Sequence, residues 1–168
     1  KATCTRAIND LSASGLISQT AEGTNKWITT AYTKSELLEK AYGRLKTPVD
    51  RILYVKGTAQ IEHPIASGIR ALARQSMIGV NDQDGAIAIS KKEAAKIPAE
   101  DICTKQYFED FGGAVIEVWS YDPIILERDG CVDDISLLLS MDNDPNERVQ
   151  TCLDEIRQKH GLPIKEEE

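Results

Sequence analysis

Three acidic residues, Glu62, Asp84 and Glu117, raise the question of metal-dependent catalysis. A restriction-type nuclease core needs a Glu-x-Lys pattern on a strand, because the lysine positions the water that attacks the phosphate beside the metal. The corresponding residues here are Glu117-Val118-Trp119, so tryptophan stands where lysine is required. We therefore expect Glu117 to be a solvent-facing strand residue and the protein not to be an enzyme, with a metal-dependent nuclease as the alternative.

Two other motifs of this chemistry are incomplete. A calcium-type loop that starts at Asp142 has oxygen-bearing side chains at its first, third and fifth positions. It has Glu147 where the loop needs glycine and Leu153 where it needs a bidentate glutamate. The tripeptide at 110–112 (DFG) has neither the glycine-rich loop nor the catalytic loop of a kinase. The sequence therefore predicts no metal ion and no cofactor.

The histidines and cysteines also lack partners for catalysis. His63 and His160 have no nucleophile at a suitable spacing, and we interpret them as surface or helix-capping residues. The four cysteines are far apart and form no C-x-x-C pair: Cys4, Cys103, Cys131 and Cys152. This spacing predicts buried free thiols in a reducing cytoplasm. Because no apolar run approaches about 20 residues, we expect a cytoplasmic protein without a membrane partner.

The first thirty residues predict a helix followed by a β-hairpin. Cys4, Ile8 and Leu11 recur at i, i+4 and i+7, which makes one apolar stripe on the helix. The other face carries polar side chains around one cation: Thr5, Arg6 and Asn9. Gly15 can take the positive φ of a helix C-cap. Residues 16–19 and 26–29 then predict two strands, joined by a turn at 22–25.

This stretch resembles a known DNA-binding fold. The run RAINDLSASGLI, followed by the hairpin GTNKWI, is similar to the second half of a winged helix-turn-helix of the MarR-like type. The resemblance implies that Thr3, Thr5, Arg6 and Asn9 face a major groove and that Lys26 touches phosphate from the wing. It also implies double-stranded DNA as the partner and a homodimer as the assembly.

The apolar stripe of this helix needs a cover. The chain opens at Lys1, where the helix begins, and it holds no earlier helix to pack on Ile8 and Leu11. We expect either that the chain is a piece of a longer protein, or that the rest of the chain or a second copy covers the stripe. On the wing, we expect Trp27 to pack inward.

Charge is divided unevenly along the chain. Residues 1–57 hold nine Lys and Arg against five Asp and Glu, a balance of +4, whereas residues 58–168 hold eleven against twenty-two, a balance of −11. A basic head on an acidic body fits a DNA-facing module joined to a second domain. The alternative is a protein–protein interaction module in which the acidic body binds a basic partner, such as a toxin, without DNA contact.

The rest of the chain predicts an α/β (α+β) fold. A capping box at 33–36 opens an amphipathic helix that ends before Pro48, so the domains are a partial winged helix at 1–47 and an α/β domain at 48–168. In the second domain the patterns predict three strands, at 51–56, 85–89 and 114–121. They also predict helices at 65–75, 91–96 and 131–140, and a last helix capped by Asp144 with Pro145 at its first position. Strands separated by helices indicate a small sheet covered by helices.

The order of segments in this body also resembles that of bacterial regulators. The segments ALARQSMIG, GAIAIS, IEVWSYDP and VDDISLLLSMDNDPNERVQ follow one another as in proteins with a winged helix, some of which are antitoxins that repress their own promoters. The resemblance implies a transcriptional regulator or antitoxin-like protein whose C-terminal α/β domain serves sensing or partner binding.

Overall fold

The computed structural model describes residues 2–23, 25–57, 60–79 and 85–164, and for residues 2 and 3 the backbone alone. The chain divides into two compact units, which we call the first and the second unit. The first consists of Lys1–Leu45 and Arg157–Glu168, and the second is Lys46–Ile156. Among the described residues, no helix combines the length and the apolar character needed to cross a membrane.

The first unit begins with the predicted helix and hairpin. Its elements are α1 (Ala2–Ala13), β1 (Ser18–Glu22), β2 (Asn25–Thr29) and α2 (Lys34–Tyr42). Gly15 has a φ of 72° and takes the left-handed conformation that the sequence predicted for it. This turn lets the Leu16 N–H donate to the Leu11 carbonyl at 3.1 Å, which closes the helix and sends the chain into β1.

The predicted capping box starts α2. The Thr33 hydroxyl accepts from the Glu36 N–H at 3.3 Å, and the Glu36 carboxylate accepts from the Thr33 N–H at 2.8 Å. The Thr33 backbone hydrogen bond is the main cause that lowers the pKa of Glu36. The first turn of α2 thus satisfies its own free donors.

The second unit is built on a five-stranded mixed sheet with the order β4-β5-β7-β3-β6. Its strands are β3 (Val49–Val55), β4 (Ile65–Ser67), β5 (Ala86–Ser90), β6 (Ile102–Cys103) and β7 (Ala114–Trp119). β5 and β7 are parallel, and the other neighbours are antiparallel. The α-helices are α3 (Gly68–Gln75), α4 (Lys91–Ala94), α5 (Lys105–Phe111), α6 (Asp134–Met141) and α7 (Glu147–Lys159), the last of which ends in the first unit. Two short 3₁₀ helices are η1 (Ala99–Asp101) and η2 (Pro123–Ile125).

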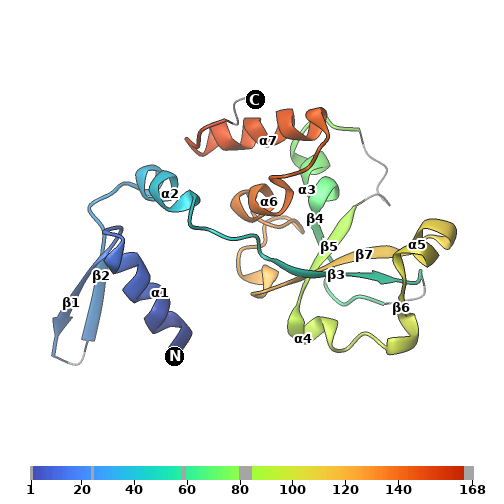
Figure 1. Ribbon diagram of the computed structural model, residues 1–168, viewed down its shortest axis with the longest axis horizontal. Coiled ribbons are helices and arrows are strands. Elements are labelled where there is room, and N and C mark those ends of the chain that lie inside the picture. Colours follow the sequence, from blue (N-terminus) through green and yellow to red (C-terminus); the bar gives the residue numbers. More distant parts are fainter. Residues whose placement is uncertain (1, 24, 58–59, 80–84, 165–168) are drawn as a thin grey trace. The chain divides into compact units, whose positions relative to one another are not determined.

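Helices cover both faces of this sheet around its central strand, β7. α3 and α6 lie on one face and α4 lies on the other, as Figure 1 shows. On the α4 face, Ile116 and Val118 of β7 join Val55 of β3 and Ile89 of β5 in an apolar cluster. The fold class is therefore mixed α/β, with helices layered on a small sheet.

Several predicted boundaries are wrong. The helix predicted at 65–75 begins only at Gly68, because Ile65–Ser67 forms β4 and pairs with β5. β6 and α5 were not predicted at all. The last helix starts at Glu147 rather than at Pro145, because Asp144 accepts from the Asn146 N–H at 2.9 Å and so closes a turn ahead of the helix.

Candidate nucleic-acid interface

The polar face of α1 is open to solvent. Thr5, Arg6 and Asn9 are all exposed. The side chains of Arg6 and Asn9 make no hydrogen bond or ion pair with any residue that the structure describes. Thr3 belongs to α1, but its side chain lies outside the described residues. The helix therefore presents a cation and an amide whose hydrogen-bonding groups are available to a ligand.

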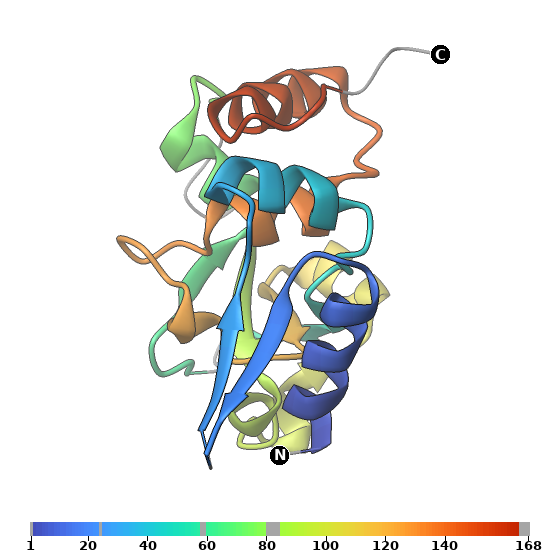
Figure 2. The same ribbon diagram turned by 90° about the vertical axis from the view of Figure 1, so that its left-hand side faces the viewer.

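The hairpin places Lys26 on the side that faces α1. Gln19 of β1 donates from its side-chain nitrogen to the Ser12 hydroxyl of α1 at 2.9 Å, which identifies this side. Ala21 is two residues further along β1, so it shares that side, and Lys26 is its partner on β2. Lys26 has no hydrogen-bond or ion-pair partner in the described part of the chain. Figure 2 shows the hairpin alongside α1.

Trp27 does not pack inward, contrary to the prediction. It is 55% exposed, and its partner in the hairpin is Thr20. Because successive side chains alternate between the two sides of a strand, Trp27 lies on the opposite side from Lys26. The hairpin is too short to enclose an indole ring, and all its described side chains are exposed.

The apolar stripe of α1 is covered only in part. Leu11 is 37% exposed and Cys4 is fully on the surface, whereas Ile8 is half-buried. Of the alternatives expected for this stripe, cover by the rest of the chain is thus only partial among the described residues. The expectation of buried thiols is wrong for Cys4, which is exposed, whereas Cys131 is buried. Leu16, at 4% exposure, is the residue that anchors the start of the wing.

Glu117 is buried, which corrects the prediction that it faces solvent. It is 9% exposed, and one of its oxygens, Oε2, accepts from the Trp119 indole N–H at 3.0 Å. The side chain lies on the sheet face covered by α3 and α6, where its neighbour on β5 is the small Ala88. Burial is the main cause that raises the pKa of Glu117, and proximity to the Trp119 indole and the Ser67 hydroxyl opposes it.

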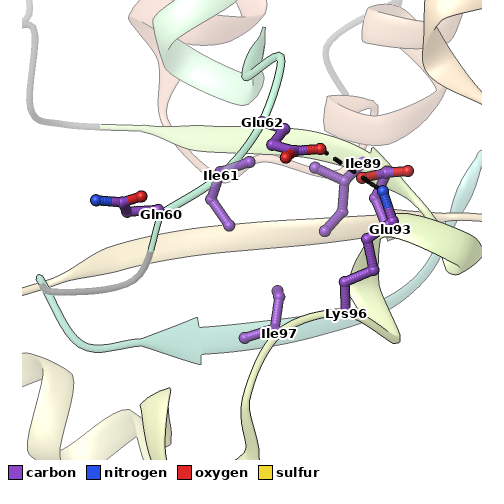
Figure 3. A pocket seen from close by; sticks show the side chains of 7 residues that line it. All are labelled: Gln60, Ile61, Glu62, Ile89, Glu93, Lys96 and Ile97. Atoms are coloured by element: carbon purple, nitrogen blue, oxygen red, sulfur yellow. Dashed lines mark hydrogen bonds and ion pairs between the residues drawn. The ribbon is translucent and has the colours of Figure 1, made fainter.

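The structure places Glu62 and Glu117, two of the three acidic residues of the nuclease alternative, apart from each other. Glu62 lines a cavity of about 280 Å³ on the side of the sheet that carries α4, which is the opposite face from Glu117. Figure 3 shows the Lys96 ammonium between Glu62 and Glu93, at 3.6 and 2.9 Å. The charges of that cavity are thus largely paired with one another. Asp84 lies outside the described residues.

Metal binding has no cluster to support it in the part of the chain that the structure describes: no three His, Cys, Asp or Glu side chains are grouped to hold an ion. The loop at Asp142 leads into a helix cap instead. Asn146 follows it and accepts from the Arg148 N–H at 3.0 Å.

The comparisons with known proteins bring no relative. No family model, no curated protein and no solved structure matches the chain. The MarR-like resemblance of the first thirty residues stays a prediction.

Proposed function

We propose that the protein is a DNA-binding transcriptional regulator or antitoxin-like protein whose helix α1 reads a major groove. The observation that carries this proposal is the exposed face of α1, where the Arg6 and Asn9 side chains have no partner in the described chain, next to a hairpin whose Lys26 lies on the face toward α1. An α-helix fits the major groove of B-DNA, and a flanking wing contacts the backbone.

The side chains fit these roles. Arginine binds the O6 and N7 atoms of guanine with two hydrogen bonds, and asparagine binds the N6 and N7 atoms of adenine. Thr5 lies between Arg6 and Cys4 on the same helix and would approach the groove edge, and Thr3 precedes it by two residues. Lys26 would neutralise a phosphate. A cytoplasmic homodimer with two such helices would read two half-sites about one helical turn apart.

The test is fluorescence anisotropy of the protein with a labelled duplex from the region upstream of its own gene, and with a scrambled duplex, at two salt concentrations. A regulator binds the upstream duplex more tightly at both salts, because base contacts add to the salt-dependent phosphate term. Equal and steeply salt-dependent binding to both duplexes, or no binding, contradicts sequence reading by α1.

A second function is favoured by the outer side of the hairpin. Trp27 is 55% exposed there, and tryptophan is enriched at the centres of protein interfaces. The hairpin would then bind a protein, and the acidic body, at −11 for residues 58–168, would favour a basic one. The matching test is a pull-down after nuclease treatment with the unchanged protein and with Trp27→Ala. A partner kept by the first and lost by the second supports this reading.

A further inference from the structure

A cavity in the second unit is lined by a buried carboxylate. Its volume is about 570 Å³, and it lies between the start of α3, β7 and the end of α6. Glu117 lines it, together with the apolar side chains of Ile69, Val115 and Met141. Pockets of this size, mostly apolar with a few polar groups, are typical of small-molecule sites.

The carboxylate of Glu117 is held by two neighbours. Oε2 accepts from the Trp119 indole at 3.0 Å, which fixes the side chain. The fully buried Ser67 hydroxyl lies close enough to the carboxylate to lower its pKa, although burial raises the pKa of Glu117 more. A carboxylate has about four lone-pair sites on its two oxygens, so these two neighbours leave acceptor capacity for the donor of a ligand.

The backbone beside Glu117 leaves room at the other carboxylate oxygen, Oε1. Gly68 has a φ of 53°, and a Cβ there would lie 3.7 Å from Oε1. A larger side chain at that position would therefore stand against this oxygen. On β5, Ala86 also lines the cavity. Small residues on two elements thus keep the approach to Oε1 open.

The charge of the cavity favours a cation. Beside Glu117, the rim carries Asp142 and Asp144 at the end of α6, where the helix dipole places partial negative charge. The start of α3 carries the opposite partial charge. Glu117 itself lies against that start, so its own carboxylate balances the dipole and leaves no reason for a second anion.

We propose that this cavity binds a small organic cation, whose ammonium or guanidinium group donates a hydrogen bond to Oε1 of Glu117 while its aliphatic part packs on Ile69, Val115 and Met141. The proposal stands independently of DNA binding, because it concerns the second unit alone. A charge-assisted hydrogen bond in a half-closed, partly apolar site is stronger than its neutral counterpart.

The test uses Trp119 as the reporter. The chain has two tryptophans, so Trp27→Phe leaves Trp119 as the single one and removes the exposed indole that lies outside the cavity. This variant is titrated at neutral pH with cyclohexylammonium and with cyclohexanol, which has nearly the same shape and no charge. We expect a saturable change in Trp119 fluorescence with the amine, and binding at least tenfold weaker with the alcohol.

Two further variants, made in the same Trp27→Phe background, separate the site from general charge effects. Glu117→Gln keeps the shape of the side chain and should weaken amine binding at least tenfold, with far-ultraviolet circular dichroism to verify the fold. Glu100→Gln removes an exposed carboxylate from η1 and should bind the amine unchanged. The proposal is overturned if the alcohol binds as well as the amine, if Glu117→Gln binds unchanged, or if the amine gives no saturable response.

Discussion

Two residues, Arg6 and Glu117, carry opposite kinds of information about this protein. Arg6 is a charged side chain on the surface with no partner among the described residues. Because it stays exposed to solvent, its charge has no desolvation cost. Glu117 is an ionisable side chain in the interior, where its charged form is costly. The first is a candidate contact whose use must be demonstrated. The second opposes folding at neutral pH, and a costly group of this kind in a cavity is a functional-site candidate.

Arg6→Ala tests the base contact. If Arg6 reads a base, the variant should lose about 1–3 kcal/mol of affinity for the cognate duplex and lose discrimination at one base position. If Arg6 binds phosphate alone, the loss is similar on cognate and scrambled duplexes and the salt dependence becomes shallower. Anisotropy titrations with both duplexes distinguish these outcomes. Lys92→Ala, which removes an exposed cation from α4 in the second unit, is the matched control and should bind as the unchanged protein does. Unchanged binding by Arg6→Ala would remove this residue from the interface.

Glu117→Gln tests the cost of burial. Because burial raises the pKa of Glu117 above 4.5, the folded protein holds the proton more tightly than the unfolded chain does. This contribution to stability is fully present below pH 4.5 and is lost as the pH rises through the folded pKa. The glutamine variant should lack this loss and be more stable at neutral pH by about 1 kcal/mol.

The measurement is urea unfolding of both proteins from pH 4 to pH 8. Glu100→Gln, which changes an exposed carboxylate, should follow the unchanged protein at each pH. A glutamine variant that is less stable at neutral pH, or a stability difference that does not vary with pH, would show that the carboxylate is stabilised when ionised.

Among the elements, the turn from α5 into β7 depends on one close approach. Gly113 has a φ of 146°, and a Cβ there would lie 2.1 Å from the Val55 carbonyl oxygen of β3. Gly112, its neighbour, has a φ of 75° with no atom within 4 Å of its Cβ position. Alanine substitutions at these two glycines therefore allow the cost of the steric clash to be separated from the cost of the backbone conformation.

Gly113→Ala should destabilise the protein by more than about 3 kcal/mol, because the backbone of β3 or β7 must move. Gly112→Ala should cost less, about 1–3 kcal/mol, because its φ of 75° and ψ of −174° lie in a region open essentially to glycine but no neighbouring atom stands in the way. Urea unfolding followed by far-ultraviolet circular dichroism gives both values. Equal losses in the two variants would mean that β3 and β7 do not approach each other as closely as this.

Elements that local sequence patterns define could be predicted, whereas strands that only pairing with distant residues defines could not. α1, the hairpin and the capping box of α2 follow from local patterns, and the structure confirms them. β4 and β6 have three and two residues, so they carry no period, and only pairing with β5 and β3 defines them. α5 had a signal in Thr104, which caps it by accepting from the Tyr107 N–H at 3.2 Å.

The error at Glu117 has the same origin. Alternation along a strand predicts which residues share a face, but it does not reveal whether that face is covered. β7 is the central strand with helices on both sides, and this depends on the order β4-β5-β7-β3-β6, which no local pattern encodes. The nearly continuous apolar run AVIEVW was the available sign, because strands buried on both faces lack polar alternation.

For the whole molecule, the two units should differ in how often they open. The hairpin of the first unit has two strands whose described side chains are all exposed, whereas β7 is paired on both edges and buried in its last four residues. Isolated two-stranded hairpins are marginally stable in water. The amides of β1 and β2 that lie in the ladder should therefore exchange with solvent roughly 100-fold or more faster than those of β7.

Hydrogen–deuterium exchange, read by mass spectrometry or NMR, makes this comparison within one sample. Tyr54 and Val55 of β3, which are paired on both edges in the same sheet, serve as the internal reference and should exchange as slowly as β7. Equal protection of the hairpin and β7 would indicate that a second copy covers the hairpin in solution. The same measurement with the upstream duplex should slow exchange in β1 and β2 if the wing contacts DNA.

The short edge strands of the second unit determine how this protein can associate with others of its kind. β6 has two residues, and the outer edge of β4 is already occupied, because Ala66 donates to the Gly130 carbonyl at 2.8 Å and accepts from the Val132 N–H at 3.0 Å. Among the described strands, such blunted edges leave only residues 49–53 of β3, which β6 does not reach, as a template on which another chain could extend the sheet. The hairpin, by contrast, has two outer edges of five residues each that pair with no other described strand. Polymerisation by strand addition, under crowding or after partial unfolding, should therefore begin more readily at the wing, which offers two open edges, than at the five-stranded sheet.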